Sequence, residues 1–449
     1  MNCDLNSFLF STPAMTGVFS AQEQLRAMVR FESALTRALE SQGRAEAGAG
    51  AVLDSMLDDG FVDVDSLQQE ARKAGNIVIP FVRQLTSAVR ARSEGASRAI
   101  HLGATSQDVL DTALVLQMRH GLKLIERAIE RLDDALVEQV RMHRETVLAG
   151  RTWLQPGPPT TLGLKLAGIL AALRRHRDRV RFAAERALVL QFGGAVGTLS
   201  ALGDSGGAVS RELARLLELR ESDLPWHSQR DNLVEIVQVL SNLTGSLAKF
   251  GRDVALLMQA EVGEASEGGS EGCGGSSTMP QKQNPVACAA AIAVHARMPG
   301  LVAVMLGAMS QEHERGLGLW QAEWDTVPEA FRLTAAALEY SIEIAEGIKV
   351  DADRMQANFD ALSGMTMAEA VSAALAPQIG RLPAHDLLRK ATMQAKKEKR
   401  HLGDVLKDTS EVTAHLSDDE IDQLLEPRAN LGSAKRFIER VLGEPNAGR

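Results

Sequence analysis

Apolar residues recur at steps of three and four positions through the middle of the chain, which is the spacing of an amphipathic helix. The longest series covers residues 110–140, and another covers residues 233–257, with Asp231 available to cap its start. A further helix is predicted to begin at Pro285, because proline is favoured at the first helical position, and another near Pro328. This pattern predicts a bundle of long helices at the centre of the chain.

Strand-like alternating stretches are few, so we expect an all-α fold with three helical domains. The predicted domains are an N-terminal domain over residues 1–108, a central long-helix bundle over residues 109–350 and a C-terminal domain over residues 351–449. Residues 286–305 are apolar around most of the helix circumference and must bury more than one face. Association with other copies of the chain achieves this, and we expect a homo-oligomer.

Composition narrows the classes of protein. The 449 residues carry a formal net charge of -9, which argues against a nucleic-acid-binding surface. Three cysteines without a paired spacing support neither a disulfide scaffold nor a zinc site, so the cytoplasm is the expected compartment. We find no signal peptide and expect no membrane-spanning segment. No cluster of carboxylates has the spacing of metal ligands, so neither a metal nor a cofactor is predicted.

A glycine- and serine-rich segment interrupts the helical pattern. Residues 263–277 read GEASEGGSEGCGGSS, and this stretch has few side chains that can be buried. Such a composition is typical either of a disordered linker or of a loop that closes over a binding site.

The residues that follow favour the binding loop. Ser276, Lys282 and Asn284 lead directly into the apolar helix, whose first N–H groups and positive dipole end attract anions. Lys282 adds a full charge, and a serine on a closing loop can move a proton beside a bound carboxylate. The phosphate-loop pattern GxxxxGK[ST] is not matched, which argues against a nucleotide site.

Three stretches carry a family resemblance. GSSTMPQKQNP, residues 275–285, resembles the signature of the fumarase/aspartase superfamily, whose members act on small polycarboxylates. HLGATSQDVLDT, residues 101–112, and GRTWLQPGPPTTLG, residues 150–163, resemble two further regions of that family in the same order. The resemblance covers about residues 1–350 and implies three helical domains, a homotetramer whose central helices form one bundle, and active sites shared between subunits.

The resemblance also implies roles for individual residues. Ser276 is expected to be the general base in the elimination direction, and Lys282 and Asn284 are expected to contact the substrate carboxylate and its enolate-like carbanion. His101 is a candidate anion ligand or proton donor, and we count it with Ser276 and Lys282 as catalytic. The expected substrate-binding residues are Thr105, Ser106, Trp153, Gln155, Ser277, Met279, Asn284 and Arg315.

Simpler interpretations remain for some of these residues. Thr105 and Ser106 also suit the cap of a helix beginning near Asp108. His101 alone is an ordinary surface or core histidine, and Arg315 lies among other charged residues. Trp320, close to Arg315 in sequence, indicates a partly buried setting in which a guanidinium binds a carboxylate.

Trp153 departs from the family pattern. Lyases of the superfamily usually have histidine here, and an indole only donates a hydrogen bond, so it cannot exchange protons. A cyclisation in which the substrate's own ionised carboxylate is the nucleophile needs no such partner. The sequence therefore favours the cycloisomerase branch of the family and an intramolecular lactonisation. The alternatives are adenylosuccinate or argininosuccinate lyase-type elimination, and an inactive helical structural protein.

Overall fold

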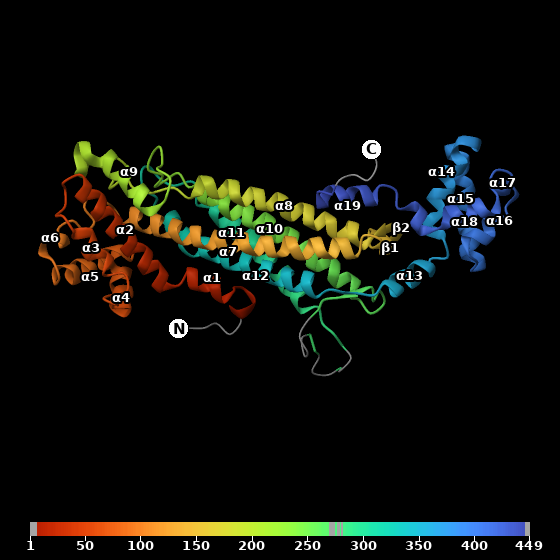
Figure 1. Ribbon diagram of the computed structural model, residues 1–449, viewed down its shortest axis with the longest axis horizontal. Coiled ribbons are helices and arrows are strands. Elements are labelled where there is room, and N and C mark those ends of the chain that lie inside the picture. The colour runs from red at the N-terminus through yellow and green to blue at the C-terminus, as the bar shows by residue number, and fades with distance from the viewer. Residues whose placement is uncertain (1–6, 269–273, 276–278, 280–281, 445–449) are drawn as a thin grey trace. The chain divides into compact units, whose positions relative to one another are not determined.

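The computed structural model describes residues 7–268, 274–275, 279 and 282–444, and nearly all of its regular structure is helical (Figure 1). The all-α prediction is confirmed. The chain forms two compact units. Unit 1 comprises Met1–Ile129, His176–Gly245 and Ala293–Glu339, and unit 2 comprises Glu130–Arg175, Ser246–Ile292 and Tyr340–Arg449.

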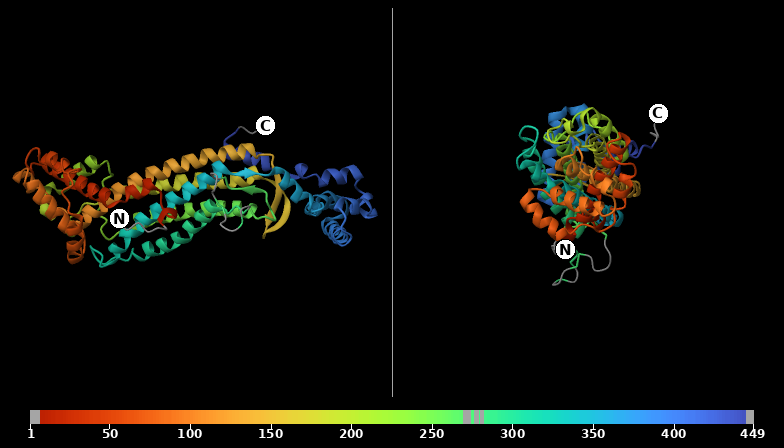
Figure 2. Two further views of the ribbon diagram at one scale, coloured as in Figure 1. Left: turned by 90° about the horizontal axis from the view of Figure 1, so that it is seen from below. Right: turned by 90° about the vertical axis from the view of Figure 1, so that its left-hand side faces the viewer.

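Long helices contribute to both units, and Figure 2 shows them from two further directions. They are α7 (Ser106–Met142), α8 (Leu162–Ala187), α10 (Asp231–Leu257), α11 (Val286–Gly307) and α12 (Leu319–Gly347). The predicted helices over residues 110–140 and 233–257 correspond to α7 and α10. Asp231 is the first residue of α10, and Pro285 directly precedes α11, so both starts agree within one residue.

The predicted helix start near Pro328 is wrong, because α12 begins at Leu319 and Pro328 lies inside it. Val327 and Phe331 are fully buried on either side of the proline. Burial of these side chains outweighs the one backbone hydrogen bond that an internal proline removes.

Unit 1 adds shorter helices to its parts of the long ones. The central one, α2 (Ala21–Ser41), begins at Ser20, whose hydroxyl accepts a 3.2 Å hydrogen bond from the Glu23 N–H, and it packs against α3 and α9. Its buried face includes Phe31 and Leu35. The other elements are η1 (Ser7–Leu9), α1 (Pro13–Val18), α3 (Ala49–Asp54), α4 (Val64–Ala74), α5 (Val78–Arg90), α6 (Glu94–Ser97), η2 (Ser200–Ser205) and α9 (Gly206–Leu217).

Unit 2 contains the strands of the described residues, as two antiparallel pairs. β1 (Val147–Thr152) pairs with β2 (Gln155–Thr161), and β3 (Ala265–Ser266) pairs with β4 (Lys349–Val350). In the C-terminal segment, residues between Phe359 and Leu425 form a separate apolar cluster that includes Val371. The helices of this segment continue beyond the cluster. They are α13 (Ala352–Asp360), η3 (Met365–Met367), α14 (Ala368–Ile379), α15 (Arg381–Glu398), α16 (Leu402–Lys407), α17 (Ser410–Thr413), α18 (Asp418–Leu425), η4 (Pro427–Asn430) and α19 (Ala434–Leu442).

Helix α11 contradicts the expectation that no segment approaches a membrane span. By length and composition alone it is long and apolar enough to cross a bilayer, and 28% of the relevant stretch is buried. One such helix is weak evidence for a membrane, since the core helix of a soluble protein passes the same test of length and composition.

Candidate active site

Arg315 and Thr105, two predicted substrate-binding residues, lie in contact in unit 1. Arg315 donates a hydrogen bond from Nη1 to the Thr105 hydroxyl, at 2.9 Å, and one from Nε to Oε1 of Gln107, at 2.7 Å. Thr105 directly precedes α7. Its hydroxyl accepts a hydrogen bond from the guanidinium rather than from the N–H groups of the helix. Burial lowers the pKa of Arg315 from its ordinary value. Ser106 is the first residue of α7 and is half-buried.

His101 is held by a buried carboxylate that the sequence analysis missed. The His101 N–H donates to Oε2 of Glu32 at 2.8 Å, and Nδ1 lies 2.8 Å from Oε1 of the same group. A carboxylate only accepts, so Nδ1 carries a proton and Nε2 is the other exchangeable position. His101 also has a φ of 59°, a left-handed conformation that this contact stabilises.

The charge of Glu32 determines the protonation of His101. Burial acts to lower the pKa of His101, but the hydrogen bond and charge of Glu32, together with the charge of Asp108, outweigh it and raise the pKa. Glu32 is fully buried in α2, 69 positions from His101, and no sequence motif marks it. The pair therefore favours the imidazolium, which is the form that donates a proton.

Asp108 organises the start of α7. Its buried carboxylate accepts hydrogen bonds from the N–H groups of Thr105, Gly193 and Gly194, at 3.0, 3.0 and 2.9 Å. Nε2 of His227 lies 2.7 Å from the same carboxylate. The backbone that carries Thr105 is therefore tied to a charged group with no exposure to solvent.

A buried arginine joins the starts of three helices. Arg230, just before α10, donates to both carboxylate oxygens of Asp111 in α7, at 2.7 and 3.0 Å. It also binds Glu323 of α12, with contacts of 2.5 to 3.1 Å. The Trp320 indole N–H donates to Asp111 at 3.0 Å. This arrangement, called here the Arg230 network, was not predicted, because its members come from segments without a shared motif.

Trp153 and Gln155 lie at the tip of the β1–β2 hairpin in unit 2. Trp153 is 97% exposed, and Gln155, the first residue of β2, is exposed as well. The two-residue turn consists of Trp153 and Leu154, with φ values of 53° and 61°. Such turns usually contain asparagine or glycine, which is why no hairpin was predicted at these residues. Two bulky side chains in this conformation cost free energy and are left facing solvent.

The hairpin is fixed close to its tip by a second buried carboxylate. Arg151 makes two hydrogen bonds with Glu264, of 2.9 and 2.5 Å, and Asn358 donates a third at 2.9 Å. Glu264 is fully buried and lies at the start of the glycine-rich segment. Burial lowers the pKa of the nearby Lys165. The hairpin and the first residues of that segment therefore share one anchor.

The start of α11 differs from the sequence expectation. The N–H groups of Ala287 and Cys288 donate to the carboxylate of Glu267, at 3.0 and 2.9 Å. These two N–H groups were expected to be free to hold a substrate anion, but an internal carboxylate occupies them. Burial, together with Glu267, raises the pKa of the Cys288 thiol.

The signature residues are only partly described. Ser276 and Ser277 lie outside the described residues. Lys282 is exposed, and its N–H donates to the carbonyl of Met279, which is also exposed, at 3.0 Å. The Asn284 N–H donates to the carbonyl of Gly274 at 2.8 Å. The predicted site residues thus form two groups, one in each unit.

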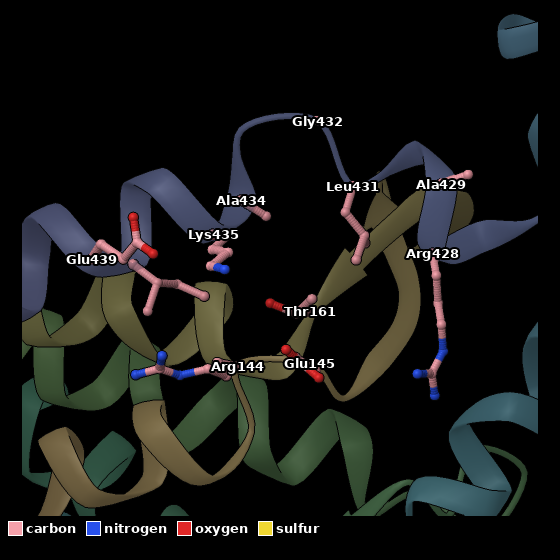
Figure 3. Close-up of a pocket in the computed structure, with 11 residues that line it drawn as sticks. Arg144, Glu145, Thr161, Arg428, Ala429, Leu431, Gly432, Ala434, Lys435 and Glu439 are labelled. Atoms are coloured by element: carbon pink, nitrogen blue, oxygen red, sulfur yellow. The ribbon is translucent and has the colours of Figure 1, made fainter. Parts of the chain in front are cut away.

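A cavity of about 380 Å³ in unit 2 has no connection with the predicted residues (Figure 3). Arg144, Glu145 and Thr161 line it from the hairpin side, and Leu431 and Lys435 line it from the C-terminal segment. No predicted site residue borders it, so we assign it no part in the reaction. Within the described part of the chain, no group of three or more histidine, cysteine or acidic side chains is arranged to hold a metal ion.

Comparison with protein families gives two matches. The family model described as "Lyase" matches residues 7–300, and the model described as "Adenylosuccinate lyase C-terminus" matches residues 364–441. The first match includes all three stretches on which the sequence resemblance was based. The second lies in the C-terminal segment, where the sequence analysis found no motif.

Relatives extend the resemblance to the whole chain. The 3-carboxy-cis,cis-muconate cycloisomerase of Pseudomonas aeruginosa is 49% identical over 98% of this chain and 95% of its own length. The enzyme of that name from Pseudomonas putida is 47% identical over 92% of this chain and 98% of its own. The crystal structure of the 3-carboxy-cis,cis-muconate lactonizing enzyme from Pseudomonas putida superposes with a TM-score of 0.92 at 46% identity, covering 98% of each chain. The chain therefore belongs to the fumarase/aspartase superfamily of lyases, within the branch of the 3-carboxy-cis,cis-muconate cycloisomerases.

Proposed function

We propose that this protein catalyses the intramolecular lactonisation of 3-carboxy-cis,cis-muconate to 4-carboxymuconolactone, a step in the breakdown of protocatechuate by the β-ketoadipate pathway. The observation that carries the proposal is the full-length identity to enzymes of that name. Trp153, where lyases of the superfamily carry histidine, supports the same reaction.

The chemistry needs one proton transfer. A carboxylate oxygen of the substrate adds to a carbon–carbon double bond of the same molecule. A C–O bond forms, and the π electrons move to the carbon beside another carboxylate. That carboxylate spreads the charge as an enolate, and a proton is then added at the carbon. A carboxyl group with a pKa of ~4 is already ionised near neutral pH, so the nucleophile needs no base. This is why Trp153, which cannot exchange protons, is compatible with the reaction.

Binding of the anionic substrate begins with Arg315, which has no carboxylate at ion-pair distance among the described residues. Arg315 is held by the neutral acceptors Thr105 and Gln107, so its charge remains available for a substrate carboxylate. Ser106 lies beside Thr105 at the positive end of the long helix α7. Family resemblance adds Lys282 and Asn284 for the carboxylate that becomes the enolate. It also adds contacts from Gln155, Ser277 and Met279.

Two residues compete for the role of proton donor. Ser276 has the role by family resemblance, but a serine hydroxyl is a weak acid. His101 is supported by its contact with Glu32, which favours the protonated ring. We propose that His101 protonates the carbon or shares that step with Ser276.

Homotetramer formation is part of the proposal. The apolar surface of α11 and the side chains of Trp153 and Leu154 are exposed in the single chain. This exposure supports an assembly in which other copies of the chain cover both regions. In this arrangement Trp153 and Gln155 complete a site on a neighbouring copy. We also propose the three-domain division at residues 1–108, 109–350 and 351–449, which the family match at residues 364–441 supports, and a cytoplasmic location.

The test is direct. The purified protein is incubated with 3-carboxy-cis,cis-muconate, and loss of the diene absorbance is followed with the Arg315→Met variant as control. We expect turnover by the wild type and a large loss in the variant. Adenylosuccinate lyase activity is the second candidate, favoured by the C-terminal family match and opposed by Trp153. Release of fumarate from adenylosuccinate, without lactonisation, would replace the proposal, and activity on neither substrate would favour a structural protein.

A further inference from the structure

The side chain of Gln107 connects the Arg230 network to Arg315. It lies in the first turn of α7 and is only 1% exposed. Its amide nitrogen donates to Oδ2 of Asp111 at 3.1 Å and to the carbonyl of His227 at 2.8 Å. Its amide oxygen accepts from Nε of Arg315 at 2.7 Å. Every polar atom of this buried amide is therefore used.

The orientation of the amide follows from the chemistry of its neighbours. A carboxylate and a carbonyl only accept hydrogen bonds, and a guanidinium only donates. Turning the amide over would place its oxygen against the two acceptors and its nitrogen against the donor. All three hydrogen bonds would be lost, so the amide oxygen of Gln107 must face Arg315.

The support behind Gln107 is itself fixed on several sides. Asp111 accepts from the two Nη atoms of Arg230 and from the indole of Trp320. Arg230 is 1% exposed at its side chain and is held by Glu323 on its other side. Buried, bidentate charged contacts of this kind leave little freedom of position. A small change at Gln107 is therefore transmitted to Arg315 rather than absorbed by the network.

The contacts of Arg315 also preserve its charge. Both of its acceptors, the Gln107 amide oxygen and the Thr105 hydroxyl, are neutral. Within the described residues, no carboxylate lies at ion-pair distance from Arg315, and the charges of Asp108 and Asp111 act on it only from farther away. A glutamate at position 107 would have nearly the same shape but would pair with the guanidinium and cancel its charge.

We propose that Gln107 is a positioning residue that aims the Arg315 guanidinium at a substrate carboxylate without pairing with its charge. This rests on the proposed function, in which Arg315 binds that carboxylate. Gln107 does not contact the substrate and acts only through Arg315. Its effect therefore falls on the binding of an anion more than on the proton transfer.

Two substitutions separate position from charge. Gln107→Met keeps the length of the side chain and removes its hydrogen bonds. Gln107→Glu keeps the shape and adds a charge beside Arg315, but it also loses the two hydrogen bonds donated by the amide nitrogen. We expect KM for 3-carboxy-cis,cis-muconate to rise about 10-fold in the first and about 100-fold in the second, the range for a hydrogen bond to a charged group, with a smaller change in kcat. Matched controls are Gln117→Met and Gln117→Glu, at a buried glutamine of the same helix that donates to the Val18 carbonyl, and these should retain the wild-type KM.

A double-mutant cycle tests the mechanism of the effect. In an Arg315→Met background, Gln107→Met should raise KM no further, because the group through which Gln107 acts is gone. Additive increases would overturn the inference and make Gln107 a structural residue. Thermal unfolding shows which variants are folded. If Gln107→Glu destabilises the protein, the neutral variant Gln107→Met is sufficient for the test.

The positioning role of Gln107 and the binding role of Arg315 are refuted by different results. A wild-type KM in Gln107→Met, with Arg315→Met impaired, overturns the positioning role and leaves the proposed function intact. A wild-type KM in Arg315→Met overturns the assigned binding role of Arg315 itself.

Discussion

Replacing Arg230 with methionine tests whether the Arg230 network is a true buried ion pair. The substitution keeps the apolar stem and removes the guanidinium between Asp111 and Glu323, whose side chains are 3% and 1% exposed. Removing one partner of a buried ion pair usually costs about 3–5 kcal/mol, since the remaining charge is left without compensation.

Two features of the structure place the cost at the lower end of that range. Asp111 keeps its hydrogen bonds from Trp320 and Gln107, and Glu323 keeps one from Gln311. A cavity of about 210 Å³ borders both carboxylates and has room for water. We therefore expect Arg230→Met to lower the free energy of unfolding by about 3 kcal/mol.

The free energy of unfolding that is lost in Arg230→Met should depend on pH, in a direction set by the pKa of Glu323. Burial already raises the pKa of Glu323, and Arg230 opposes that effect, so removing Arg230 raises this pKa further. A carboxyl group whose pKa is higher in the folded state binds a proton on folding, and it destabilises the fold as pH rises above the unfolded-state pKa. The loss should therefore be smaller near pH ~5 than near pH ~8.

Urea unfolding followed by far-ultraviolet circular dichroism, at one protein concentration and at both pH values, measures the effect. Arg186→Met is the matched control, because Arg186 also makes a two-point contact with a glutamate, Glu235, but their side chains are 50% and 35% exposed. Its removal should change stability little. An Arg230→Met protein as stable as the control would refute the argument, since the two carboxylates would then have to be neutral or hydrated in the wild type.

Three further predictions concern catalysis. Glu32→Gln removes the carboxylate charge, so burial becomes the main influence on His101 and lowers its pKa. The alkaline limb of the pH–rate profile should therefore move to lower pH. A limb that does not move excludes His101 as the proton donor. Lys282→Met should lower kcat/KM about 100-fold, because the carboxylate and the developing enolate both lose a charged partner, and an unchanged kcat/KM removes that role. Trp153→His should neither accelerate lactonisation nor add an inflection near pH ~6.5, and a large gain in rate would contradict the argument that proton transfer at oxygen is unnecessary.

Local pattern was enough for the elements that depend on neighbouring residues. The three- and four-residue apolar spacing predicted α7 and α10 to within a few residues, because burial of one helix face leaves that period in the sequence. Pro328 misled the prediction of α12, since a proline signals a helix start only when packing does not override it. The β1–β2 hairpin gave no signal, because its turn uses Trp153 and Leu154 in place of the residues that usually mark such turns.

By itself the sequence determined the family and the type of reaction. The signature stretch, residues 275–285, indicates the family, and Trp153 indicates the type of reaction, from residue identity alone. Tertiary structure alone brought Glu32 to His101, Gln107 to Arg315 and Arg230 to its two carboxylates. These contacts join positions 69, 208, 119 and 93 residues apart. In each, a residue of a helix meets a residue of a connecting segment, and the local pattern of the helix is satisfied with or without that contact. The physical reason is that a buried charge is stabilised by whichever opposite charge or dipole the packed helices bring near it, and that choice leaves no periodicity in the sequence.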